Sequence, residues 1–198
     1  GMGSAVGQEP KVLQELVIWV RAATKLPVIA KLTPNISDIT EPALAAARGG
    51  AHAVSLINTI QSVMGVDLDR LVPLPRVGGA SSHGGFCGPA VKPIALRMVA
   101  VLAREPSFIL PISGIGGIAT WSDAAEFLAL GATTVQVCTA VMHKGFRIVE
   151  DMIDGLSAYL RRKGMARVTD LVGAAVPAFK EWGDLDLNYH VVARIDGA

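Results

Sequence analysis

The stretch FILPISGIGGI (residues 108–118) decides the fold of this chain. It is a continuous apolar run that ends in a glycine-rich turn, which predicts a buried strand leading into a helix. Three further runs have the same near-continuous pattern, typical of parallel strands covered on both faces: 26–34, 51–59 and 132–140. Helical patterns separate or follow the strands: 10–24, 39–48, 89–104, 121–130 and 146–163. The predicted order is therefore one helix followed by four strand-helix units.

The position of the glycine-rich turn distinguishes between two α/β architectures. A doubly wound nucleotide-binding fold would carry a GxGxxG turn after its first strand, whereas here the first strand ends in KLTPN (31–35) and SGIGGI closes the third. In TIM (β/α)8 barrels the phosphate site commonly follows strands 7 and 8. We therefore expect the C-terminal half of such a barrel, strands 5 to 8, within residues 1–163.

A complete barrel needs eight units and about 250 residues. The first residues lead straight into a helix with no preceding strand, so we expect the chain to be part of a larger polypeptide. The alternative is a native half-barrel that closes by dimerisation.

Composition excludes several functional classes. The chain is 51% hydrophobic with a net charge of +1, its basic residues are scattered, and aromatic residues are 5%, so a nucleic-acid partner is not expected. No apolar stretch approaches the roughly 20 residues of a membrane span, and the start lacks export features, which predicts a cytoplasmic protein without membrane association. Cys87 and Cys138 form no CxxC pair, so no metal or iron-sulfur site is expected in this chain.

Polar residues at the strand ends are the candidates for chemistry. Lys31 interrupts an apolar strand, where its ammonium could stabilise an anionic reduced flavin or act as a Schiff-base nucleophile; a snorkelling lysine is the structural alternative. Asn58 and Thr59 end the second strand, and an amide can pair with a pyrimidine ring unless it only caps a turn.

Small residues at the next two strand ends predict a phosphate site. Gly114, Gly116 and Gly117 leave the backbone accessible, and we expect the helix that starts near Thr120 to add N–H groups and a dipole. Cys138-Thr139 would supply more backbone donors at the neighbouring strand end. Tight strand-helix packing without a ligand is the alternative.

The segment from Ile60 to Gly88 is much longer than an ordinary βα connection, which is typical of a functional loop or lid. His83 within it could transfer a proton, although a solvent-exposed loop histidine is the favoured interpretation. Asp67 and Asp69 are expected to cap the loop rather than to bind a metal.

Several blocks together resemble the FMN barrel of the dihydropyrimidine dehydrogenases, and more loosely that of the dihydroorotate dehydrogenases. The blocks are AKLTPN, SLINT, GGFCGPAVKPIALRMVA, PISGIGGIATWSDAAEFLALGA and TVQVCTAVM. The resemblance implies an oxidoreductase that reduces uracil or thymine to the 5,6-dihydro form, with FMN as the cofactor. It also implies iron-sulfur clusters outside this chain, a partner flavoprotein that oxidises NAD(P)H, and an oligomer. Dihydroorotate oxidation and, less favoured, a Schiff-base lyase are the alternative activities.

The resemblance assigns roles to individual residues. Those that match FMN-binding positions are Lys31, Gly88, Gly116, Gly117, Cys138 and Thr139, and those that match pyrimidine-binding positions are Asn58 and Thr59. We expect the isolated chain to be inactive because it would lack half of the FMN contacts.

The residue that protonates the ring carbon is where the sequence departs from the resemblance. In the animal enzymes a cysteine stands before Gly-Gln-Asp-Pro, but here Val6 precedes Gly-Gln-Glu-Pro, and valine carries no transferable proton. Ser4, the nearest hydroxyl, is the candidate acid, and His83 is second. The substitution also leaves open a non-catalytic half-barrel that serves in assembly. Residues 164–198 resemble the family's connection to an absent iron-sulfur module.

Overall fold

Four parallel strands form the central sheet of the computed structural model, which describes residues 6–185. Their order in the sheet is the order along the chain: β1 (Ile29–Lys31), β2 (Ala53–Leu56), β9 (Ile112–Ile115) and β10 (Thr134–Gln136). Each strand pairs with the next of these strands in the sequence, as successive units of a barrel do. The prediction of consecutive parallel β/α units is confirmed, and each strand lies inside one of the four apolar runs.

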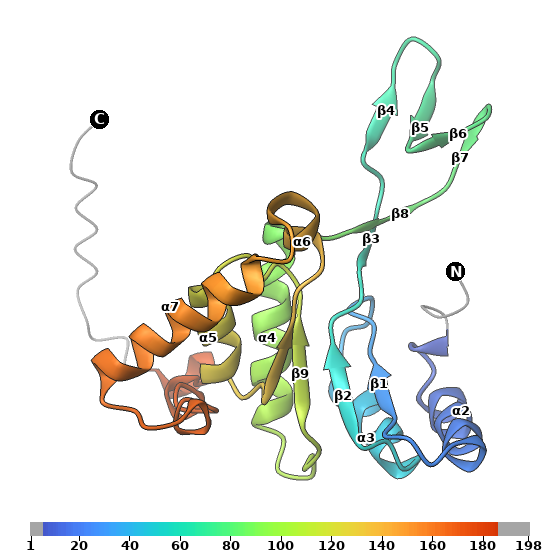
Figure 1. The fold of residues 1–198 in the computed structure, drawn as a ribbon. Coiled ribbons are helices and arrows are strands. Elements are labelled where there is room, and N and C mark those ends of the chain that lie inside the picture. Colours follow the sequence, from blue (N-terminus) through green and yellow to red (C-terminus); the bar gives the residue numbers. More distant parts are fainter. Residues whose placement is uncertain (1–5, 186–198) are drawn as a thin grey trace, which may run out of the picture.

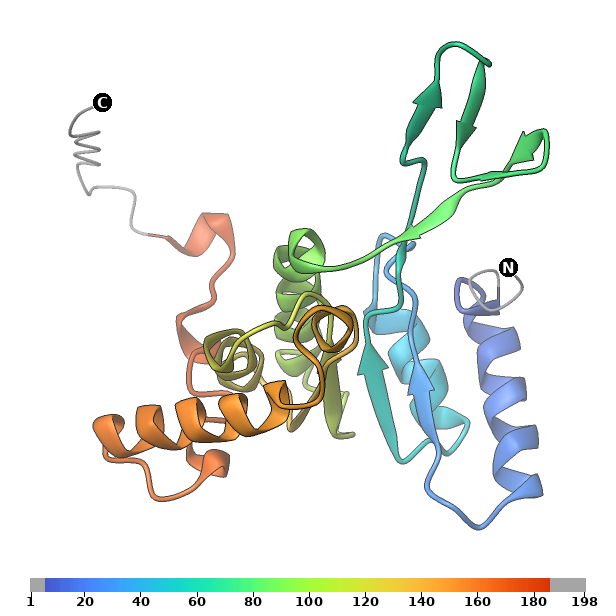
Figure 2. The ribbon, with the colours of Figure 1, turned by 45° about the horizontal axis from the view of Figure 1, so that its top comes forward.

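Helices flank this sheet (Figures 1 and 2). They are α2 (Pro10–Ala23), α3 (Thr40–Arg48), α4 (Lys92–Ala103), α5 (Trp121–Ala129), α6 (Thr139–Lys144) and α7 (Ile148–Lys163). The first packs against α3, while α3, α4 and α5 lie side by side against the strands. The predicted helices agree with these bounds within about three residues, and α6 is an addition that the sequence did not predict.

The core lies between the helices and the strands and consists of fully buried apolar side chains. Its largest members are Phe127, Leu32, Leu56, Leu102, Val54 and Val99. A Cβ at Gly114 would lie 2.5 Å from Cδ1 of Phe127, so this position must be glycine for the strand to pack against α5. Gly114 therefore has the packing role, which was one of the two alternatives for the glycine-rich turn.

The ends of two helices show why they begin and stop where the sequence predicts. Thr120 caps α5 in a capping box, in which its hydroxyl accepts the N–H of Asp123 and the Asp123 carboxylate accepts the N–H of Thr120. Gly164 ends α7 in the left-handed conformation, with φ of 68°.

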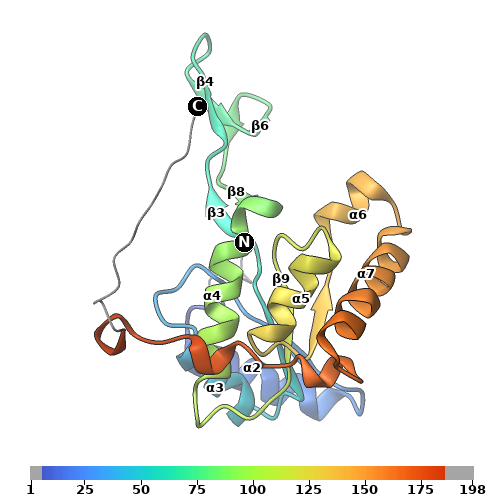
Figure 3. The same cartoon turned by 90° about the vertical axis from the view of Figure 1, so that its left-hand side faces the viewer.

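The long segment after β2 is an ordered arm rather than an irregular loop. The arm, residues 60–86, contains six short strands: β3 (Ile60–Ser62), β4 (Gly65–Asp67), β5 (Val72–Leu74), β6 (Arg76–Val77), β7 (Ala80–Ser81) and β8 (Gly84–Phe86). Antiparallel pairing of β3 with β8 brings its two ends together, and its tip projects away from the sheet in all three views (Figures 1–3).

The segment that follows α7 folds back onto α5 (Figure 3). Leu171 is 3% exposed, and the N–H groups of Gly173 and Ala175 donate to the carbonyls of Leu128 and Ala129, each at 2.9 Å. Residues up to about 178 are therefore anchored on the helical layer. None of the helices within residues 6–185 is long and apolar enough to cross a membrane.

Candidate functional site

A cavity of about 270 Å³ lies at the carboxyl ends of the four strands. It gathers the predicted FMN-binding and pyrimidine-binding residues: Lys31, Asn58, Thr59, Gly88, Gly116, Gly117, Cys138 and Thr139. These residues come from all four strand ends and from the return of the arm, so separate parts of the sequence converge as predicted. Ser4 lies outside the described residues.

The ionisable nitrogen groups that line the cavity are all basic. Lys31 and Lys144 contribute ammonium groups and His143 an imidazole, while no aspartate or glutamate from residues 6–185 lines the cavity. A concave site with cationic groups and low-dielectric walls attracts anions. The cavity therefore suits a ligand that carries phosphate or another negative group.

The turn Gly116-Gly117 forms one wall and needs glycine for two reasons. Both residues have positive φ, 138° and 76°, which L side chains rarely adopt. A Cβ at Gly117 would also lie 2.8 Å from the carbonyl oxygen of Gly88 and 2.9 Å from Cβ of Lys92. The missing side chains thus let the turn approach the start of α4, and they leave the backbone of the turn facing the cavity.

Some N–H groups at the start of α5 are bonded within the chain. Oδ2 of Asp123 accepts the N–H of Ala119 at 2.9 Å and the N–H of Thr120 at 2.8 Å, and the Thr120 hydroxyl accepts the N–H of Asp123. Residues 116–119 line the cavity, whereas Thr120 and the first residues of α5 do not. The turn before the cap therefore lies closer to the space for a ligand than the helix start does.

An ion pair lies directly behind this turn. Nζ of Lys92 is 2.6 Å from Oδ1 of Asp123 and 2.9 Å from Oε2 of Glu126. The hydrogen bond to Asp123 is the main reason that the pKa of Lys92 is raised. Burial alone would raise the pKa of Asp123, but hydrogen bonds from Lys92, Ala119 and Thr120 together lower it. Both groups are therefore held in their charged forms.

The pyrimidine-binding candidates lie on a rim that Asn35 holds in place. Nδ2 of Asn35 donates to the Thr59 carbonyl at 3.1 Å, and its Oδ1 accepts the N–H of Gln61 at 2.8 Å. Oδ1 of Asn58 accepts the N–H of Thr59 at 2.9 Å, which is the local contact of a residue that caps a turn. Asn58 nevertheless lines the cavity, and the two roles are compatible because its amide also carries N–H donors.

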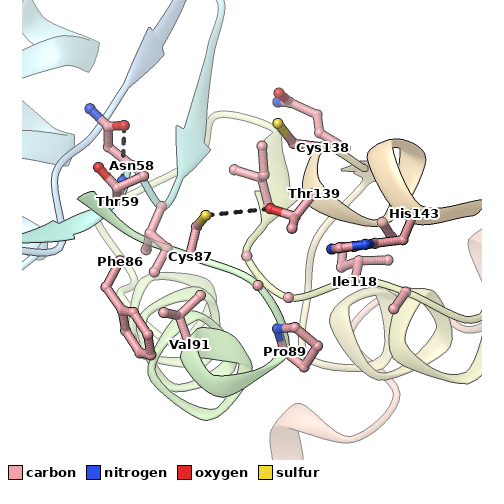
Figure 4. A pocket seen from close by; sticks show the side chains of 18 of the residues that line it. Asn58, Thr59, Phe86, Cys87, Pro89, Val91, Ile118, Cys138, Thr139 and His143 are labelled. Carbon is pink, nitrogen blue, oxygen red and sulfur yellow. Dashed lines mark hydrogen bonds between the residues drawn. The ribbon is translucent and has the colours of Figure 1, made fainter. Parts of the chain in front are cut away.

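The opposite rim joins the last strand to the end of the arm (Figure 4). The hydroxyl of Thr139 donates to Sγ of Cys87 at 3.4 Å, and both residues line the cavity together with Cys138. Both cysteines are free thiols. The connection between the arm and the sheet is therefore part of the site, although the tip of the arm is not.

Gln136 is a lining residue that the sequence analysis missed. Its Nε2 donates to the hydroxyls of Ser55 and Ser113, each at 2.8 Å, and these serines are 2% and 6% exposed. It lies two positions before Cys138, so alternation along the strand would have placed both side chains on one face. The network forms a polar layer beneath the cavity.

His143 and Lys144 were missed because α6 was not predicted. They follow Thr139 by one helical turn, and this spacing returns their side chains to the cavity. Nζ of Lys144 donates to the carbonyl of Ala119 at 2.9 Å, which links α6 to the segment before α5.

His83 does not belong to this site. It is exposed on the arm and does not line the cavity, so its position does not support the proton-donor role and agrees with a loop histidine. Asp67 accepts the N–H of Arg70 at 3.1 Å and pairs with the Arg70 guanidinium at 3.0 Å, as expected of a loop cap.

Consecutive parallel β/α units with a cavity at the carboxyl ends of their strands define a protein of the TIM-barrel class. Within this class, the chain belongs to the dihydroorotate dehydrogenase family, whose model matches residues 2–160.

The chain is similar to relatives whose names describe two different activities. The chain is 48% identical over 196 residues to the NAD-dependent dihydropyrimidine dehydrogenase subunit PreA of Escherichia coli, covering 98% of this chain and 48% of the relative. It is 43% identical over 188 residues to the chloroplastic dihydropyrimidine dehydrogenase (NADP(+)) of Arabidopsis thaliana, covering 93% and 44%.

The catalytic subunit of dihydroorotate dehydrogenase B (NAD(+)) from Pyrococcus horikoshii is 43% identical over 176 residues, covering 89% of this chain and 56% of the relative. The chain thus spans about half the length of the curated relatives it matches.

Proposed function

We propose that this chain forms the C-terminal half of an FMN-binding barrel that reduces uracil or thymine to the 5,6-dihydropyrimidine. The observation that carries the proposal is one cavity that is lined by all the candidate FMN-binding and pyrimidine-binding residues. The relatives named dihydropyrimidine dehydrogenase support the reaction, since their similarity extends over nearly the whole chain.

The residues of the cavity fit FMN. The glycine turn and Cys138-Thr139 leave backbone close to the cavity, and Lys144 adds a cation beside them, which suits a phosphate group. The absence of carboxylates from the described lining removes a source of repulsion. When bound, FMN supplies two-electron hydride chemistry that no side chain of the protein can perform.

The chain's own residues bind and orient. Lys31, at the end of β1, holds a positive charge at the cavity wall, which favours an electron-rich ligand placed beside it. Asn58 and Thr59 are proposed to hold the pyrimidine through its alternating carbonyl and N–H groups. Asn35 fixes the backbone of this rim, so their position is maintained before the substrate binds.

Ser4 is the proposed acid that delivers a proton to the ring carbon, and this assignment rests on the resemblance alone. The electrons are proposed to come from NAD(P)H through a partner flavoprotein subunit and iron-sulfur clusters outside residues 1–198. Relatives whose names describe them as subunits support a partner.

The test uses the protein in the form in which it occurs in the cell, purified and examined for bound flavin. The reduced protein is then mixed anaerobically with uracil, thymine or orotate, and flavin reoxidation is followed by absorbance. Reoxidation by uracil or thymine is expected, and a Ser4→Ala variant should reoxidise much more slowly while keeping its flavin. Reoxidation by uracil at an unchanged rate in that variant would remove Ser4 from the mechanism.

Dihydroorotate dehydrogenation is the second candidate because an archaeal catalytic subunit with that name is 43% identical. The same experiment separates the two, since this activity would give reoxidation by orotate and none by uracil. The greater identity and coverage of the dihydropyrimidine dehydrogenase subunit favour the first candidate.

A further inference from the structure

Lys92 lies at the end of the first turn of a helix that begins with the 3-10 turn Pro89–Val91 and continues as α4. The helix dipole places partial positive charge near a helix start, where acidic side chains are preferred. The side chain of Lys92 is 25% exposed, so its charge is only partly hydrated. The carboxylates of Asp123 and Glu126 offset both costs.

Both oxygens of the Asp123 carboxylate accept hydrogen bonds, and the two oxygens have different partners. Oδ1 accepts from Nζ of Lys92, while Oδ2 accepts the N–H groups of Ala119 and Thr120 and the Thr120 hydroxyl at 2.8 Å. The carboxylate is 14% exposed, so few waters compete for these bonds. The Lys92 ammonium thus fixes the group that holds the backbone of residues 119 and 120.

The backbone and Cβ of Lys92 also pack against the glycine turn. A Cβ at Gly117 would lie 2.9 Å from Cβ and 3.1 Å from N of Lys92, which shows how closely the turn packs on the start of α4. Lys92 itself does not line the cavity, whereas Gly116, Gly117 and Ala119 do. Its contacts therefore surround the segment from Gly116 to Thr120 without reaching the space for the ligand.

We propose that Lys92 and Asp123 form a clamp that positions the glycine turn for the phosphate of the cofactor. Lys92 is a positioning residue in this account and does not touch the ligand. The inference rests on the proposed flavin function for its ligand, but its geometric part concerns this chain alone. If the clamp exists, loss of the Lys92–Asp123 pair weakens binding of the phosphate group and hardly changes binding of the flavin ring.

The experiment compares wild type with Lys92→Gln and Lys92→Arg by two readouts, in the protein as it occurs in the cell. The first is amide hydrogen exchange of peptides that cover residues 116–120, which requires no flavin. The second is the ratio of the dissociation constants for riboflavin and FMN, measured after removal of bound flavin. These two ligands differ by the phosphate, so a general loss of folding would weaken both.

We expect faster exchange over residues 116–120 in Lys92→Gln. We also expect about a tenfold loss of FMN affinity, the size expected if the displaced turn loses one charge-assisted hydrogen bond to the phosphate, with riboflavin affinity changed less than about threefold. Lys92→Arg should restore both because it keeps the charge. Arg104→Gln is the matched control, since it removes the 2.8 Å pair with Glu181 at the other end of α4.

The outcomes separate the clamp from the function. Faster exchange with an equal loss of FMN and riboflavin, or unchanged exchange, would overturn the clamp. A wild type that binds no flavin would contradict the proposed function; faster exchange in Lys92→Gln would then still support the positioning of the turn, and unchanged exchange would overturn both.

Discussion

Lys31 ends an edge strand of the described sheet and is in register with buried Ser55, so its ammonium stands at the cavity wall. Lys31→Met keeps the length of the side chain and removes the charge. We expect bound flavin to persist and reoxidation by uracil to slow by about 10²-fold, as for loss of one electrostatic group in an active site. Lys25→Met, on the exposed connection before β1, is the control and should leave the rate unchanged.

Lys144 is the second cation of the cavity, and its position on α6 suits a role in binding rather than in the reaction. Lys144→Gln should weaken FMN binding by about three- to tenfold, since the side chain is exposed and its charge is partly screened. The difference between wild type and variant should shrink at high salt. Fluorescence titration of FMN measures both effects, and a salt-independent loss would contradict the electrostatic explanation.

Asp123 makes stability depend on pH in a defined direction. Its pKa is lowered in the folded state, so its stabilisation is complete above the ordinary value of about 3.9 and disappears as pH falls through the lowered value. The raised pKa of Lys92 acts in the opposite direction: its stabilisation is present at lower pH and is lost only as pH rises above about 10.4.

The free energy of unfolding of Asp123→Asn, from urea titrations, should therefore lie below that of wild type by a constant amount from about pH 5 to 9. The difference should narrow below about pH 4, where wild-type Asp123 becomes protonated. A difference that stays constant down to pH 2 would show that charge is not the cause.

At the scale of elements, continuous apolar runs and cap residues made the four strands and five helices predictable. Their sequences carry local signals, such as the Thr120 cap and Gly164. The helix α6 was missed because it has six residues and follows its strand directly. The strands of the arm have two or three residues each, and their structure depends on cross-strand partners that no local pattern reveals.

In the site, too, residues with a local sequence signal were predictable, and those that depend on tertiary packing were not. Lys31 and the glycines were predictable because each is unusual where it stands in the sequence. The pair Lys92–Asp123 joins residues 31 positions apart and required the packing of α4 on the turn. That the Asp123 carboxylate accepts the N–H groups of Ala119 and Thr120, just before α5, likewise could not be predicted from the strand and helix patterns.

The tip of the arm is predicted to be dispensable for flavin binding. Pairing of β3 with β8 holds its base, and Phe86, at the end of the arm, and the adjoining Cys87 line the cavity. Replacing residues 63–83 by an Asn-Gly turn should leave flavin affinity within about threefold of wild type, because a two-residue turn suits the hairpin between Ser62 and Gly84. Loss of flavin from a folded variant would show that the tip of the arm contributes to the site.

At the scale of the whole molecule, the described sheet has two open edges, at β1 and β10, and a closed (β/α)8 barrel has none. Lys31 lies on one of these edges and the site is built along the sheet, so the described strands form part of the wall that a closed barrel would have. This arrangement agrees with relatives about twice as long as this chain.

We propose that these four strand ends bind FMN for the reduction of a pyrimidine. The decisive measurement is anaerobic reoxidation of the reduced protein, followed by the absorbance of its flavin. We expect bound FMN that is reoxidised by uracil or thymine. Purified protein without flavin, or flavin that is reoxidised by orotate and not by uracil or thymine, would contradict it.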